Sequence, residues 1–269
     1  MTNKLCSFCG KDADECLILI EGSHANICGI CVDGCKILVD KNFQDLLTKR
    51  RVKLSELLTE RDHMWLATTD APYHALLTSG KHSDGFVNMS NALTDHDIIE
   101  SVFASSADLV EFCDENNVTV LCGQAMGSIG FAAILAQSLQ AHVAVRPIFT
   151  EKDGDLMSLN RFDVKDQNVL LIEDVTTTGS TSLKSLKAIE SKGGTVVGIY
   201  TAVNRSGKIT IEFSGPGPLR ELRSIPILSA LDVEIKTFEA SDCPLCANGS
   251  EAIKPKANWD LLTQKQSDV

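Results

Sequence analysis

The sequence lacks the features that mark several large classes of protein. It contains no apolar run long enough to cross a bilayer, and its first residues lack the apolar core of a signal peptide. It has no excess of positive charge, because 36 acidic residues outnumber 25 lysines and arginines for a net charge of −11. No Gly-Lys-Ser/Thr sequence follows a spaced glycine, so there is no P-loop. We therefore expect a cytoplasmic protein without a membrane or nucleic-acid partner.

What is present fits a globular protein with more than one part. The 269 residues are 43% hydrophobic and the mean hydropathy is close to zero, which allows one large domain or two unequal ones. Six of the ten cysteines lie within the first 35 residues. In a cytosolic protein such clustering indicates metal binding more often than disulfides.

Two Cys-x-x-Cys pairs, Cys6 with Cys9 and Cys28 with Cys31, are separated by 18 residues. This spacing predicts a structural Zn²⁺ site with four thiolate ligands. So short a segment buries little apolar surface, so a metal is the natural means of stabilising it. Cys16 and Cys35 fall outside the paired spacing, and we interpret them as small apolar residues of the miniature core.

The residues around these cysteines, about 4–43, resemble the N-terminal zinc-binding domain of the ClpX chaperone. That family's domain dimerises and docks adaptors or substrates, and no ATPase module follows here. The resemblance therefore implies a homodimer and an adaptor or peptide partner for residues 1–48. The basic run at 49–53 that follows is expected to be a solvated face or linker rather than a nucleic-acid contact, and an amphipathic helix is expected over residues 52–66.

The most informative stretch is residues 169–181. Four apolar residues predict a short buried strand that ends before Glu173 and Asp174, and a turn rich in hydroxyls then leads into a helix over 183–191. Such a turn offers N–H groups to an anion at a helix N-terminus, and carboxylates accept hydrogen bonds from vicinal hydroxyls. The pattern predicts a site for ribose 5-phosphate.

A second loop of the same kind lies about fifty residues earlier. A predicted strand over 118–122 is followed by small residues at 123–130 and a helix over 131–139, after a long helix at 98–116. Small residues at a helix N-terminus let the backbone approach an anion closely. Two anion loops suit a ligand with phosphate at both ends. Pro147 in the next strand, at 143–149, indicates either an edge strand or the end of that strand.

Residues 169–181 resemble the signature of the type I phosphoribosyltransferases, and residues 55–258 as a whole resemble orotate phosphoribosyltransferase. The resemblance implies a parallel-sheet α/β domain over 49–269 with a small hood at about 70–92 and a C-terminal tail. It also implies transfer of ribose 5-phosphate from 5-phosphoribosyl diphosphate (PRPP) to orotate, with Mg²⁺ bound to the diphosphate.

The resemblance and the residue pattern together assign roles to individual residues. Catalysis falls to Lys152, Glu173 and Asp174, of which Lys152 neutralises the departing pyrophosphate from a mobile loop at 150–157. The base contacts are Phe86 and Arg205. The PRPP contacts are Lys81, Ala125, Met126, Gly127, Arg161, Glu173, Asp174, Thr176, Thr177, Thr178, Gly179, Ser180 and Thr181. A solvated Glu-Lys pair is the alternative interpretation of Lys152.

Two departures from the family pattern keep other functions open. Asn204 stands where related enzymes have an acid, and Ser128 stands where many have a second glycine. A different base, or a regulator that senses PRPP and signals through the zinc module, are therefore alternatives. Cys243 and Cys246 form one further Cys-x-x-Cys pair, which supplies only two ligands, and we expect it to be structural without metal.

Overall fold

The computed structural model describes residues 4–263 except 13–14, 17, 24, 69, 125 and 215–221. The chain forms two compact units, Met1–Lys49 and Arg50–Val269, and each is described by itself. Within the described residues, no helix is long and apolar enough to cross a membrane.

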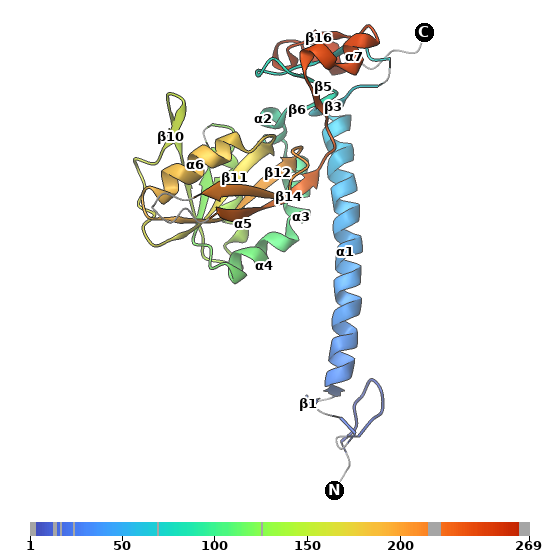
Figure 1. Cartoon of the computed structure of the whole chain (residues 1–269). Helices are drawn as coiled ribbons and strands as arrows, with labels where there is room; N and C mark the ends of the chain where they lie inside the picture. Colours follow the sequence, from blue (N-terminus) through green and yellow to red (C-terminus); the bar gives the residue numbers. More distant parts are fainter. Residues whose placement is uncertain are drawn as a thin grey trace. The chain divides into compact units, whose positions relative to one another are not determined.

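The first unit is small and contains few buried apolar side chains. Strands β1 (Leu19–Glu21) and β2 (Asn26–Cys28) form an antiparallel hairpin, and helix α1 (Gly29–Glu60) starts directly after β2 (Figure 1). Among the described residues of this unit, the buried apolar side chains are Cys6, Cys28 and Leu47. Cys16 and Cys35 are only half-buried. A core this small depends on a further stabilising element.

The second unit is built on a six-stranded sheet with the order β13-β14-β12-β11-β7-β8. Its strands are β7 (Val120–Gly123), β8 (Arg146–Phe149), β11 (Asn168–Thr176), β12 (Thr195–Asn204), β13 (Thr210–Ser214) and β14 (Leu222–Asp232). All neighbours are parallel except β13, which runs antiparallel to β14. The predicted parallel-sheet α/β fold is confirmed, and Pro147 lies in the edge strand β8 as expected.

Helices cover both faces of this sheet, so its central strand is apolar on both sides. Leu170 and Ile172 of β11 share a core with α3 (His96–Ala104), α4 (Ala107–Glu115), α5 (Ile129–Leu139) and the end of α1. Val169 and Leu171 face the other way, into a core shared with α6 (Ser180–Glu190). The alternation follows from the two-residue period of a strand.

The single helix expected over residues 98–116 is wrong, because the chain breaks it into α3 and α4. The Ser105 hydroxyl donates to the carbonyl of Ser101 at 2.8 Å, and Ser106 donates to that of Val102. Such side chains compete with the helical backbone pattern. Ser106 also hydrogen-bonds the buried Tyr200 hydroxyl, which fixes the break against β12.

The first segment of the second unit also differs from expectation. The helix predicted over 52–66 is part of α1, which ends at Glu60, and residues Met64–Leu66 form strand β3 instead. The basic run is not simply solvated, because Arg50 donates to the carbonyl of Ala104 at 2.8 Å. A basic side chain at this carbonyl satisfies the C-terminal end of α3.

The hood is a set of short strands completed by the C-terminal tail. Strand β3 pairs with β6 (Gly85–Val87), and a four-stranded sheet has the order β15-β5-β4-β16. Its members are β4 (Tyr73–Leu76), β5 (His82–Ser83), β15 (Thr237–Phe238) and β16 (Glu251–Ile253). The short helices around it are α2 (Met89–Ala92), η1 (Ala240–Asp242), α7 (Pro244–Ala247), η2 (Pro255–Ala257) and α8 (Trp259–Thr263).

The segment at 150–157, expected to be a mobile loop, forms a hairpin. Strands β9 (Glu151–Asp153) and β10 (Leu156–Ser158) are antiparallel, and the turn contains Gly154 with a φ of 59°. Glycine adopts this left-handed conformation without a steric cost.

Candidate functional site

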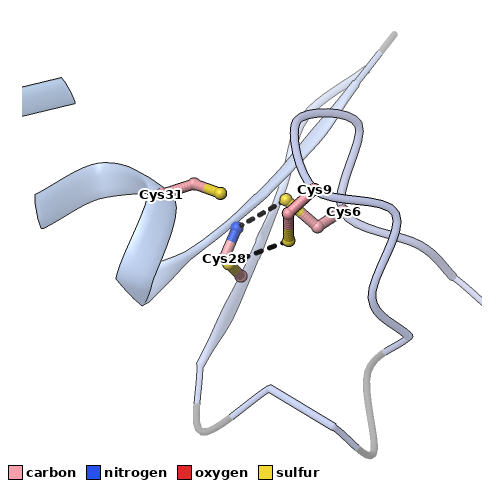
Figure 2. A group of neighbouring side chains, drawn as sticks. All are labelled: Cys6, Cys9, Cys28 and Cys31. Carbon is pink, nitrogen blue, oxygen red and sulfur yellow. Dashed lines mark hydrogen bonds between the residues drawn. The ribbon is translucent and has the colours of Figure 1, made fainter. Parts of the chain in front are cut away.

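The four cysteines of the first unit converge on one point (Figure 2). Their sulfur atoms all lie within 4.8 Å of one another, and the Cys9 and Cys28 sulfurs are 3.7 Å apart. A tetrahedral site with Zn–S bonds of about 2.3 Å requires sulfurs about 3.8 Å apart. The backbone N–H of Cys28 donates to the Cys6 sulfur at 3.3 Å, a contact that stabilises and orients a thiolate ligand. The donor set fits zinc.

The site in the second unit begins at the carboxyl end of β11. Pairing of β11 with β7 stops at Ile172 and Gly123, whereas pairing with β12 continues to Thr176. Glu173 and Asp174 are therefore inside the strand, not beyond its end as predicted. Because β11 projects past β7, these two carboxylates lie where the sheet opens.

This opening is a topological switch point of the sheet. The connection from β7 through α5 leads outward to β8, and the connection from β11 through α6 leads the other way to β12. The two helices pack on opposite faces, so a crevice forms between the loops that follow β7 and β11. Open α/β sheets bind ligands in such a crevice.

A polar cavity occupies the crevice and brings together residues from both predicted anion loops. Its lining consists of Gln124, Gly127, Ser128, Glu173, Asp174, Val175, Thr177, Gly179, Ser180 and Thr181. The N-terminus of α6 faces this cavity through Ser180, and the first N–H groups of a helix have no partners within the helix. The arrangement suits an anion beside a hydroxylated group.

Asp174 presents its carboxylate to the cavity, and Gly127 makes room for it. A Cβ atom at position 127 would lie 2.4 Å from the Asp174 Oδ2 atom, so a side chain there would displace the carboxylate. Asp174 is half-buried, and its other oxygen accepts from the Val175 N–H at 2.9 Å. The two loops therefore meet at this carboxylate.

Glu173 is held differently, in the interior. Its oxygens accept hydrogen bonds from Gln124 at 2.9 Å, from Thr176 at 2.7 Å and from Ser182. Burial raises the pKa of Glu173, although these three donors act in the opposite direction. A carboxylate has about four lone-pair positions, so most of its accepting capacity is taken by the protein.

The remaining predicted PRPP contacts of these loops lie around the cavity rather than in its lining. Thr176 is fully buried, Thr178 is exposed, and Met126 is 80% exposed. Ala125 lies outside the described residues. The lining residue Gln124 was not predicted. Ser182, whose hydroxyl accepts a hydrogen bond from the Gln124 amide, was not predicted either. Their signal in the sequence was only their position beside the two loops.

The predicted base contacts meet at the hood. The Arg205 guanidinium donates to the Ser83 hydroxyl at 2.9 Å and to the Gly85 carbonyl at 3.4 Å. Burial lowers the pKa of Arg205. Phe86 follows in the same strand and packs edge-on against Trp259 with the ring centres 5.9 Å apart. These hydrogen bonds connect the loop after β12 to the strand that carries Phe86.

Asn204 organises the turn before Arg205. Its amide donates to the Asp232 carboxylate at 2.8 Å and to the Lys208 carbonyl at 3.0 Å, and its oxygen accepts from the Ser206 N–H at 3.0 Å. An acid at position 204 would face the Asp232 carboxylate without a donor. The departure from the family pattern is thus matched by Asp232.

The three predicted cationic contacts are exposed and lie outside the cavity lining. Lys81 pairs with Glu239 at 2.5 Å, and Arg161 pairs with Glu151 at 2.8 Å. Lys152 stands on β9, in register with Met157 of β10. The structure does not bring these three residues together with the two acids.

Comparison with known proteins places both parts of the chain. A family model described as a phosphoribosyl transferase domain matches residues 90–210, and one described as a ClpX C4-type zinc finger matches residues 4–41. The orotate phosphoribosyltransferase of Caldanaerobacter subterraneus subsp. tengcongensis is 34% identical over 185 residues, which are 68% of this chain and 87% of the relative. That of Campylobacter lari is 33% identical over 186 residues, 68% and 90% of the two chains. The crystal structure of orotate phosphoribosyltransferase from Aeropyrum pernix has a TM-score of 0.48 and 24% identity, covering 67% of this chain and 93% of that one.

Proposed function

The chain belongs to the orotate phosphoribosyltransferase family, and we propose that it transfers ribose 5-phosphate from PRPP to orotate, releasing pyrophosphate and forming orotidine 5′-phosphate. The observation that supports this most is the cavity at the switch point, which is lined by two anion loops with the Asp174 carboxylate between them. The order of these groups matches that of PRPP, which has a phosphate on each side of a ribose diol.

In this proposal each loop binds one end of PRPP. The loop at Thr177, Ser180 and Thr181 binds the 5′-phosphate through backbone N–H groups, hydroxyls and the positive end of α6. The loop around Gly127, with Ala125 and Met126, binds the pyrophosphate. Asp174 accepts hydrogen bonds from the ribose hydroxyls, and Glu173 supports the same strand while holding Gln124 and Thr176 in place.

The reaction needs no covalent nucleophile. Pyrophosphate leaves the anomeric carbon as positive charge develops on the ribose, and a ring nitrogen of the base then attacks. The protein contributes positioning and electrostatic stabilisation. Mg²⁺, which binds oxygen ligands, would be held by diphosphate oxygens, water and the half-exposed Asp174, and it supplies neutralisation of the diphosphate charge.

Lys152 and Arg161 carry the charge that the departing pyrophosphate requires. Both are on or next to the β9–β10 hairpin and both are exposed, so the hairpin would bring them to the cavity when PRPP is bound. Arg161 then exchanges its pairing with Glu151 for the substrate. Lys81 contacts the diphosphate. Phe86 and Arg205 form the base side of the site, with Arg205 binding the orotate carboxylate.

The zinc module supplies the partner contacts in this proposal. Residues 1–48 would form it and residues 49–269 the catalytic domain. Its surface exposes many large apolar side chains: Phe8, Ile18, Ile20, Ile30, Ile37, Leu38 and Val39. Exposed apolar side chains of this size favour an interaction surface, and we propose that the module forms a homodimer contact and docks an adaptor or peptide in the cytoplasm.

A second candidate function rests on the same fusion. A zinc module is not needed for transfer to orotate, so the domain could instead sense PRPP and pass the signal to a partner. The third is a phosphoribosyltransferase for another base, which rests on Asn204 and Ser128.

The decisive experiment is orotate-dependent release of pyrophosphate from PRPP and Mg²⁺ by the zinc-loaded full-length protein. We expect turnover on the order of 1 per second or more. Lys152→Ala should lower kcat by roughly 10²–10³-fold, the usual cost of losing one group that stabilises transition-state charge. PRPP binding measured by calorimetry should change little.

The matched control is Lys192→Ala, which removes an exposed lysine after the end of α6. It should keep the activity of the unaltered protein. PRPP binding without turnover on orotate would contradict the proposed reaction and favour the sensor or another base. Equal activity of the Lys152 and Lys192 variants would refute the role of Lys152.

A further inference from the structure

Four side chains of types that bind metals gather in the hood of the second unit. His74 of β4, His82 of β5, Cys243 before α7 and Cys246 in α7 have their ligand atoms within 4.8 Å of one another. Each histidine is more than 150 residues away from each cysteine in the chain. Cys243 and Cys246 supply only two ligands themselves, and the fold places two histidines beside them as further ligands.

The distances between ring nitrogens and sulfurs are close to those of a tetrahedral zinc centre, whereas the two ring nitrogens lie closer together. The His74 Nε2 atom lies 3.6 Å from the Cys243 sulfur and 3.5 Å from the Cys246 sulfur, and the His82 Nδ1 atom lies 3.3 Å from the Cys246 sulfur. Zinc bonds of about 2.3 Å to sulfur and 2.0–2.1 Å to nitrogen place sulfur and nitrogen about 3.5 Å apart, and two nitrogens about 3.3 Å apart. The two ring nitrogens here are 2.9 Å apart.

Ordinary hydrogen bonding does not account for this cluster. The His74 Nε2 atom has three polar neighbours within 3.6 Å, namely His82 and both sulfurs. One imidazole nitrogen either donates or accepts a single hydrogen bond. His74 Nε2 can therefore pair with only one of the three, and even if His82 pairs with Cys246 the four groups compete for few hydrogen bonds where His74 and Cys243 are buried. A cation at the centre satisfies all four groups at once.

The surroundings of His74 support the same conclusion. Its other nitrogen, Nδ1, lies 3.0 Å from the Ser250 hydroxyl. A histidine that binds metal through one nitrogen characteristically donates its other N–H to an oxygen, which fixes the tautomer and the ring orientation. The ring is fully buried, so that orientation is also set by packing.

We propose that the protein holds a second zinc ion, bound by His74, His82, Cys243 and Cys246. With four protein ligands and no open position, the site is structural rather than catalytic. The ion fastens the C-terminal tail to the hood. Both outer strands of the hood sheet, β15 and β16, come from the tail and are only two and three residues long, so their hydrogen bonds alone hold the tail weakly.

The test is the zinc content of the purified full-length protein, measured by mass spectrometry of the metal after removal of loosely bound ions. We expect two zinc ions per chain. Cys246→Ser and, separately, His82→Ala should each lower the content to one, while Cys113→Ala, which removes a buried thiol outside both clusters, should leave it at two.

A spectroscopic measurement tests the ligand set independently. In the Cys9→Ser protein, which has lost the first unit's site, Co²⁺ added in place of zinc should give the visible bands of a tetrahedral centre with two thiolates and two imidazoles. One zinc ion per chain in the unaltered protein, or no tetrahedral Co²⁺ bands in the Cys9→Ser protein, would overturn the proposal. If Cys246→Ser fails to fold, His82→Ala and the Co²⁺ spectrum still decide it.

Discussion

At the scale of single residues, the cavity depends on glycines at positions where a side chain has no room. Gly179 is the N-cap of α6 and has a φ of 76°, and a Cβ there would lie 2.2 Å from the Ile211 Cδ1 atom. Gly127 similarly adjoins Asp174. These two glycines belong one to each loop, so the loops can approach a ligand closely on both sides.

Gly179→Ala should destabilise the second unit through both its backbone conformation and its contact with Ile211. The left-handed conformation alone costs about 1–2 kcal/mol for a residue with a Cβ. Urea unfolding followed by circular dichroism measures the change. Gly154→Ala is the matched control, because its φ is 59° and nothing lies within 4 Å of the added Cβ. This variant should lose only the stability that depends on backbone conformation. Equal losses of stability in the two variants would refute a contribution from the contact with Ile211.

At the scale of elements, α3 is anchored by charge at its first turn. Asp95 is its N-cap and accepts from the Asp97 N–H at 3.0 Å, while Arg61, just after α1, pairs with both Asp95 and Asp97. The Arg61 hydrogen bond is the main cause that lowers the pKa of Asp95 below its ordinary value of 3.8. This contact joins the segment after α1 to the main body of the second unit.

Asp95→Asn should keep the cap but lose the ion pair, because asparagine caps helices about as well as aspartate. A carboxylate whose folded pKa is lowered stabilises the fold above its unfolded pKa, and that contribution disappears as pH falls through the folded pKa. The variant should therefore be less stable near neutral pH, and the difference should shrink below pH 3.8. Urea midpoints across this range measure it.

The control for this prediction is the same substitution in an Arg61→Gln background. There Asp95→Asn should have little effect, since the partner is already absent. A full effect in that background, or a difference that does not depend on pH, would contradict the ion-pair explanation.

At the scale of the whole molecule, the two units are stabilised by different means. The second unit has two extensive apolar cores, one on each face of its sheet. The first has few buried apolar side chains among its described residues and four converging thiols instead. Metal binding and folding are therefore coupled in the first unit.

Cys9→Ser should release the zinc of the first unit and unfold that unit while the second stays folded. Hydrogen exchange should show lost protection in the hairpin of β1 and β2, with β11 and β12 unchanged. The mass in light scattering should fall if the module dimerises. Cys35→Ser, outside the cluster, is the control, and an unchanged mass in the Cys9 variant would exclude the dimerising role.

Much of this protein was determined by the sequence over short distances. The paired cysteines of the first unit, the strand, loop and helix around Asp174 and the parallel sheet were all predicted, and the resemblance to both families is confirmed. The cysteine spacing and the strand, loop and helix around Asp174 depend on residues close in sequence, whereas the parallel sheet was implied by the resemblance. Hydrophobic period, glycine position and cysteine spacing record such contacts directly.

Only the tertiary structure decided the contacts between segments that are distant in the sequence. Burial of Glu173 follows from Gln124 and Ser182, and the break between α3 and α4 is fixed by Tyr200. The meeting of His74 and His82 with Cys243 and Cys246 depends on tail strands that flank the hood. No local period encodes which strands become neighbours, because that choice depends on how the whole sheet closes, and so the second cluster is visible only in the folded chain.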